Sequence, residues 1–195
     1  MNYYEKYKVD VPEGISGEWK VEKFTVAEND IGAISYALHG RPVPPGTYTR
    51  LKKEGAWDPM MSDTPAEIRD HMEFIHRATG RCLLNGLGLG VVLKAILAKP
   101  GVTQVDVVEI EQDVINLVWP TYKDGNRVAL YHTDAFTIQW PKDTRWDCAW
   151  HDIWPALCTD NLPEVAKLKH KYARKVKYQK AWMEEELRDY RRRGG

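Results

Sequence analysis

The feature that most constrains this chain is a turn with three glycines, which stands between an apolar run and a helical run. It reads Leu83-Leu84-Asn85-Gly86-Leu87-Gly88-Leu89-Gly90-Val91. Positions without side chains let a ligand approach the backbone closely, and the start of the following helix offers free N–H groups. The turn is therefore either a ligand site or a tight structural turn with nothing bound, and residues further along the chain decide between the two.

Downstream of the glycines, apolar runs typical of strands alternate with short helical runs. Strands are expected over 82–84, 105–110, 128–131 and 146–150, and helices over 91–98 and 113–118. Upstream, Thr64, Pro65 and Glu67 have the spacing of a capped helix start, and Gly80 supplies an end, which predicts a helix over 65–79. Strands joined by helices form a parallel sheet. The sequence therefore predicts an α/β fold with a truncated, Rossmann-like parallel sheet of four strands in the order 3-2-1-4.

Two segments flank this core. We expect a small β appendage, the Rossmann-like core and a C-terminal segment at residues 1–61, 62–160 and 161–195. In the last segment, apolar residues recur at helical spacing from Val165 to Tyr190 with basic residues between them, which predicts one long amphipathic helix, or two. No fifth strand is expected, so the fourth strand is an uncovered edge. We therefore expect a homo-oligomer, most simply a symmetric dimer packed through the long helix.

Acidic residues stand at the ends of the second and third expected strands. Glu109 follows Gly90 by about 20 residues, the spacing at which a carboxylate accepts hydrogen bonds from the two hydroxyls of a ribose. Asp134 is placed to accept from an adenine amino group, while Ala135 offers a backbone N–H to a ring nitrogen. Because the ends of parallel strands meet at one edge of a sheet, these residues and the glycine turn predict an adenosine site.

The glycine spacing separates two kinds of adenosine cofactor. NAD sites usually have the pattern GxGxxG, which would place glycine where this chain has Val91. Residues 81–155, with the glycine turn and the run Val107-Val108-Glu109-Ile110-Glu111, resemble the core of class I S-adenosylmethionine-dependent methyltransferases, and are most similar to their spermidine synthase-like branch. The resemblance implies S-adenosyl-L-methionine as the cofactor, held by Asn85, Gly86, Leu87, Gly88, Gly90, Glu109, Ile110, Asp134, Ala135 and Asp152.

Three residues after the fourth strand are candidates for the reaction itself. In the related families an Asp at the position of Asp152 orients the amine of the cofactor or deprotonates the nucleophile, so the resemblance implies a catalytic carboxylate; the alternative is a helix cap. His151 is a second candidate proton carrier, or bonds only a backbone carbonyl. Trp154 is a candidate for stacking on the substrate, against a role in the core.

Charge and composition exclude several classes of protein. The 28 Lys and Arg balance the 28 Asp and Glu, no apolar run is long enough to cross a bilayer, and the N-terminus has no apolar secretion signal, which predicts a cytoplasmic protein with no membrane partner. Acidic residues outnumber basic ones from Gln104 to Pro163, and the reverse holds from Glu164 onward. This favours a neutral or cationic small molecule over nucleic acid, which would have to bind through the basic tail. No metal site is predicted.

The sequence therefore favours a methyltransferase that acts on a small-molecule nucleophile. Two alternatives stay open: an aminopropyltransferase like spermidine synthase, and a cofactor-binding module without catalysis that works through a partner. Leu89 stands where spermidine synthases usually have Asp, which disfavours aminopropyl transfer.

Overall fold

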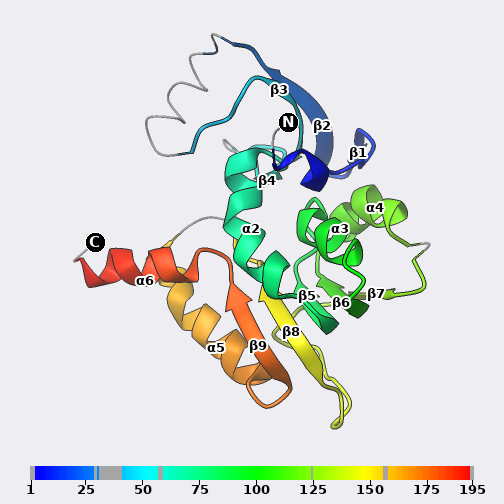
Figure 1. Ribbon diagram of the computed structural model, residues 1–195, viewed down its shortest axis with the longest axis vertical. Helices are drawn as coiled ribbons and strands as arrows, with labels where there is room; N and C mark the ends of the chain where they lie inside the picture. Colours follow the sequence, from blue (N-terminus) through cyan, green and yellow to red (C-terminus); the bar gives the residue numbers. More distant parts are fainter. Residues whose placement is uncertain are drawn as a thin grey trace.

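The computed structural model describes residues 3–28, 30, 41–56, 59–123, 125–155 and 158–193. Its main sheet has five parallel strands, β5 (Gly80–Asn85), β6 (Val102–Glu109), β7 (Val128–His132), β8 (Trp146–His151) and β9 (Val176–Ala181). They lie in the order β7-β6-β5-β8-β9 (Figure 1). The Rossmann-like α/β fold is confirmed, and the sheet is one strand wider than expected.

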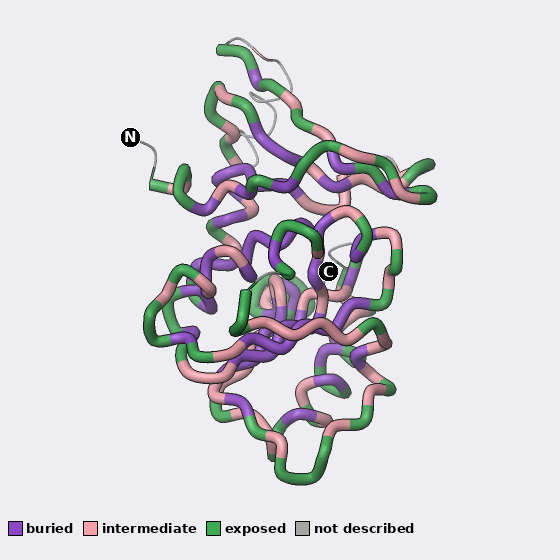
Figure 2. Tube along the Cα trace, turned by 90° about the vertical axis from the view of Figure 1, so that its right-hand side faces the viewer, coloured by how far each residue is buried: buried purple, intermediate pink, exposed green. Residues whose placement is uncertain are grey.

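Helices cover both faces of this sheet. Helices α2 (Pro65–Arg77), α3 (Val91–Leu97) and α4 (Gln112–Val118) bury their apolar side chains on one face, and α5 (Leu162–Tyr172) packs on the other. Short 3₁₀ turns lie at Glu5–Tyr7, Trp119–Thr121 and Thr159–Asn161. Buried residues concentrate along the sheet and the helix faces that touch it (Figure 2). Within the described residues, no helix combines the length and the apolar character that a membrane span requires.

Helix α2 begins at the predicted proline but is not capped as expected. The Thr64 side chain makes no capping hydrogen bond. Glu67 instead accepts hydrogen bonds from the backbone N–H and the hydroxyl of Ser62, because the chain enters the helix directly from a strand. The helix ends at Arg77, and Gly80 begins β5 rather than ending the helix.

The N-terminal β segments form a separate antiparallel sheet. Its strands are β1 (Gly14–Ser16), β2 (Trp19–Val26), β3 (Gly46–Lys53) and β4 (Met61–Ser62), in that order. Asp63, directly after β4, accepts hydrogen bonds from the backbone N–H groups of Val9 and Thr49, at 3.1 and 2.7 Å. Ser16 donates to Asp113 of α4 at 2.7 Å. These bonds fix the small sheet against the core.

The prediction of a long C-terminal helix is wrong. The chain instead forms α5, the strand β9 and a second helix, α6 (Glu184–Arg192). Strand β9 pairs with β8 in parallel, so residues from 161 onward complete the main sheet and the fourth strand is not an edge. Val165, Leu168 and Tyr172 are buried within the same chain. The premise on which a dimer was expected, an apolar stripe projecting past the core, therefore does not hold.

Much of the basic charge of this segment is used inside the chain. Lys169 and Arg188 both pair with the buried Glu184, and Lys177 pairs with Asp147. Lys171 donates to the backbone carbonyls of residues 135, 136 and 138. These cations therefore already have partners within the chain.

Candidate functional site

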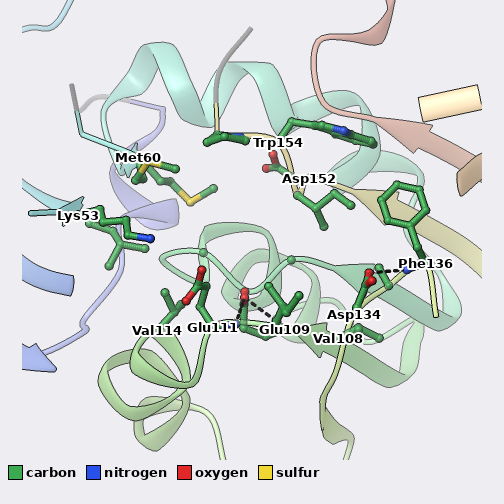
Figure 3. A pocket seen from close by; sticks show the side chains of 18 of the residues that line it. Lys53, Met60, Val108, Glu109, Glu111, Val114, Asp134, Phe136, Asp152 and Trp154 are labelled. Atoms are coloured by element: carbon green, nitrogen blue, oxygen red, sulfur yellow. Dashed lines mark hydrogen bonds between the residues drawn. The ribbon is translucent and has the colours of Figure 1, made fainter. Parts of the chain in front are cut away.

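The carboxyl ends of the central strands open into a cavity of about 750 Å³. Its floor comes from the glycine turn after β5, from the end of β6 and from the residues after β6 and β7, and its walls come from the residues after β8 and from the N-terminal sheet (Figure 3). Its volume falls within the range of pockets that hold a small organic ligand. The site residues predicted from the sequence lie at or near this cavity.

The glycine turn fits tightly against other parts of the chain. Gly86 lines the cavity with φ +101°, and a Cβ there would lie 2.0 Å from the carbonyl oxygen of Asp152. Gly90 does not line the cavity; it has φ +80°, and a Cβ there would lie 2.5 Å from the ring of Tyr122. At both positions the fold itself requires glycine, so part of the motif is structural.

Between these two positions, a methionine covers the turn. A Cβ at Gly88 would lie 2.8 Å from the sulfur of Met61, and the backbone N–H of Leu89 donates to that sulfur at 3.2 Å. Gly88 and Met61 both line the cavity. The backbone at Gly88 is thus covered by the side chain of Met61, which is flexible enough for a ligand to displace it.

Glu109 lies at the floor of the cavity with its carboxylate fixed. Its two oxygens accept three backbone N–H groups, from Leu87 at 2.8 Å, Ile110 at 2.8 Å and Glu111 at 2.9 Å. An ionised carboxylate offers about four acceptor sites, so about one remains for a ligand hydroxyl. The backbone N–H of Leu87 therefore helps to hold the carboxylate of Glu109 in place. The neighbouring Ile110 is 59% exposed and lines the cavity.

Asp134 and Ala135 lie beside Glu109 on the loop after β7. One oxygen of Asp134 accepts the backbone N–H of Phe136 at 2.7 Å. The carbonyl of Ala135 accepts from Lys171 and from the hydroxyl of Tyr172, at 2.9 and 3.2 Å. Both residues line the cavity. Side chains of α5 thus hold this loop in place by donating hydrogen bonds to the carbonyl groups of the loop.

Asp152 lies in the cavity wall opposite Glu109 (Figure 3). Burial raises the pKa of its carboxyl to about 7, and the carboxylates of Glu67, Asp70 and Glu109 add to the increase. Residues 153–155, directly after Asp152, form no helical turn, so Asp152 does not cap a helix. A carboxyl that titrates near neutral pH suits proton transfer.

His151 and Asn85 do not line the cavity. Both are fully buried, and they lie 2.8 Å apart between Nδ1 of the histidine and Nδ2 of the asparagine. The other ring nitrogen of His151 lies 3.1 Å from Oε1 of Gln179 on β9. Burial lowers the pKa of His151 to about 4, which keeps the ring neutral. The predicted proton carrier thus supports the sheet, and Asn85 contributes through its backbone carbonyl, which accepts the N–H of Asp152 at 2.9 Å.

Trp154 belongs to the core and also reaches the cavity. Its ring is 8% exposed and belongs to the core beneath α5, yet it also lines the cavity. Its indole N–H donates to Glu164 at 2.9 Å, which fixes the ring.

Several lining residues were missed by the sequence analysis. They include Trp19, Leu51, Lys53, Met60 and Met61 from β2, β3 and the segment that leads into α2, Glu111 and Val114 at the start of α4, and Asn161 and Glu164 at the start of α5. Alternation along β3 offered a signal, because it places Leu51 and Lys53 on one face. In the described ranges, no group of three His, Cys, Asp or Glu side chains gathers closely enough to hold a metal ion.

No family model and no curated protein matches this sequence. Among solved structures, the N-methyltransferase NodS of Bradyrhizobium japonicum WM9 matches with 11% identity and a TM-score of 0.42, over 56% of this chain and 57% of that protein. The CcbJ methyltransferase of Streptomyces caelestis matches with 17% identity and a TM-score of 0.44, over 57% and 45%. A dimethyladenosine transferase of Plasmodium falciparum matches with 20% identity and a TM-score of 0.36, over 47% and 32%. The chain thus spans less than two thirds of the length of each of these proteins.

Proposed function

We propose that this protein is an S-adenosyl-L-methionine-dependent methyltransferase that acts on a small-molecule acceptor. The observation that carries the proposal is the convergence of three consecutive strand ends, with Gly86, Glu109 and Asp134, on one cavity that also contains Asp152. Glu109 would accept a ribose hydroxyl with its remaining acceptor site, and Asp134 and Ala135 would face the adenine. Ile110 offers an apolar surface beside them.

The cofactor would supply a methyl group bound to a positively charged sulfur. The protein would hold the acceptor in line with that methyl, and orientation accounts for much of the rate increase in such reactions. Asp152 would accept the proton that an amine or hydroxyl acceptor loses as its new bond to carbon forms. Trp154 and the apolar lining would exclude water from the reacting atoms.

A second candidate is aminopropyl transfer, as in the spermidine synthase-like branch. The antiparallel N-terminal sheet favours it, because the resemblance to that branch implies such an element. The two reactions leave different products. Methyl transfer from S-adenosyl-L-methionine leaves S-adenosylhomocysteine, whereas aminopropyl transfer requires the decarboxylated form of that cofactor and leaves 5′-methylthioadenosine. Reactions supplied with each donor in turn, followed by chromatography of the spent cofactor, therefore separate the two.

We expect Glu109→Gln to weaken the binding of S-adenosylhomocysteine by about 1.5 to 3 kcal/mol, because a charged acceptor of a ribose hydroxyl is lost. Titration calorimetry measures the change, and NAD should not bind either protein. Glu186→Gln, at an exposed carboxylate on α6, is the matched control. Equal affinity of the wild type and Glu109→Gln would contradict the ribose assignment.

A further inference from the structure

One wall of the cavity carries a lysine that the cofactor assignment does not use. In the register of the N-terminal sheet, Trp19 of β2 pairs with Lys53 of β3, and Leu51 lies on the same face of β3. All three line the cavity. The neighbouring cations of β3 point to the other face, where Arg50 and Lys52 meet Glu22, at 2.6 and 3.9 Å. The fold therefore separates Lys53 from the charges that surround it in the sequence.

Within the cavity, Lys53 has little to neutralise it. Its nearest acid is Glu18, at 3.8 Å, with a side chain that is 70% exposed. The ammonium also lies 5.4 Å from the centre of the Trp19 ring. Among the described residues that line the cavity, Lys53 is the single lysine or arginine. A ligand with a negative group therefore has one place to pair in this cavity.

A carboxylate faces this lysine. Figure 3 shows the side chains of Lys53 and Glu111 approaching each other from the N-terminal sheet and from the start of α4, and no ion pair joins them. Three of the other four acids that line the cavity accept N–H groups: Glu109 three, Asp134 one and Glu164 one. The fourth, Asp152, lies in the wall opposite Glu109 and has the role proposed above. The carboxylate of Glu111 accepts no hydrogen bond from any part of the chain that the structure describes. The two opposite charges are thus both available to a ligand.

We propose that Lys53 and Glu111 form a binding site for a zwitterionic amino-acid group, with the ligand carboxylate on Lys53 and the ligand ammonium on Glu111. A ligand with one charge would leave the other protein charge partly enclosed and unpaired, which is unfavourable, whereas a zwitterion satisfies both. The inference rests on the proposed function for its ligands. Two sources share this chemistry: the amino-acid end of the cofactor, and an amino acid that serves as acceptor.

The test compares ligands with and without an amino-acid group. Calorimetry measures the affinities of S-adenosylhomocysteine, of 5′-methylthioadenosine, which lacks that group, and of a panel of free L-α-amino acids with and without S-adenosylhomocysteine. Lys53→Gln and Glu111→Gln are compared with Lys52→Gln, the adjacent lysine on the opposite face of β3. We expect each of the two site variants to weaken the amino-acid ligand by about tenfold or more, while 5′-methylthioadenosine and the control variant are unaffected.

The pattern of losses identifies the source. If S-adenosylhomocysteine alone is weakened, the site holds the amino-acid end of the cofactor; if it binds normally and a free amino acid is weakened, the site holds an acceptor. Unchanged binding of every amino-acid ligand overturns the proposal, and so does an equal loss for 5′-methylthioadenosine, which would indicate a structural change. If the wild type binds neither S-adenosylhomocysteine nor 5′-methylthioadenosine, the proposed function fails. The free amino acids then still test Lys53 and Glu111. Amino-acid binding that both variants lose supports the zwitterion site, and the absence of any amino-acid binding overturns it.

Discussion

Asp152→Asn is expected to lower the rate of methyl transfer by at least about 100-fold, the usual effect of removing a positioned general base. Asparagine has nearly the same shape but cannot take a proton from the acceptor. The measurement is transfer of labelled methyl groups from the cofactor into a small-molecule mixture, followed on the acceptor that it identifies. Binding of S-adenosylhomocysteine is the control and should change little. An Asp152→Asn protein that retains its rate would show that the carboxylate only orients ligands.

The same variant has a signature in stability that needs no acceptor. Because burial raises the pKa of Asp152 from about 4 in an unfolded chain to about 7, ionisation of this carboxyl disfavours the folded state. The wild type should therefore lose stability as the pH rises from about 4 to about 7, and Asp152→Asn should not lose that contribution. Melting temperatures should agree near pH 4, and the variant should be the more stable above pH 7. A constant difference across this range would mean that the carboxyl is well solvated.

Gly86→Ala is expected to lower the free energy of unfolding by about 3 kcal/mol or more, through overpacking and an unfavourable backbone angle together. A Cβ at this position would lie 2.0 Å from the carbonyl oxygen of Asp152, with φ +101°. To relieve this overlap, β5 would have to move away from the loop after β8. Because both segments line the cavity, ligand binding should fail as well. Urea unfolding measures the stability.

Gly55→Ala is the matched control for the backbone angle alone. It has φ +76°, and a Cβ there meets nothing within 4 Å. We expect a loss of about 1 kcal/mol. Similar losses for Gly86→Ala and Gly55→Ala would show that the strand and the loop yield easily, and that the contact with Asp152 is not rigid.

The core of the fold could be predicted because its signals are local. The apolar runs that become β5 to β8 are short and bounded by glycine or polar residues, and Pro65 marks the start of α2. Glu109, Asp134 and Asp152 could be placed because each lies at or shortly after the carboxyl end of a predicted strand, and the ends of parallel strands meet at one edge. Their position in the chain was sufficient to predict that these three carboxylates lie near one another.

The C-terminal segment could not be predicted because its local and tertiary signals disagree. Val176 continues the helical spacing of Val165, Leu168 and Tyr172, and the turn over 173–175 contains no glycine or proline. Pairing with β8 decides the outcome, and no local pattern reports a partner strand. The surroundings of His151 could not be predicted for a related reason, since its ring lies against Gln179 of β9, a strand that was not expected.

The cavity lies between two parts of the chain that are far apart in the sequence. The strand ends of residues 85 to 155 form one side, and β2, β3 and the methionines at 60 and 61 form the other. Substitutions at Trp19, Leu51 or Lys53 alter that side. Under the proposed methyl transfer, changes on these two strands would alter which acceptor fits the cavity, and an identical glycine turn in two such proteins would not show that they modify the same molecule.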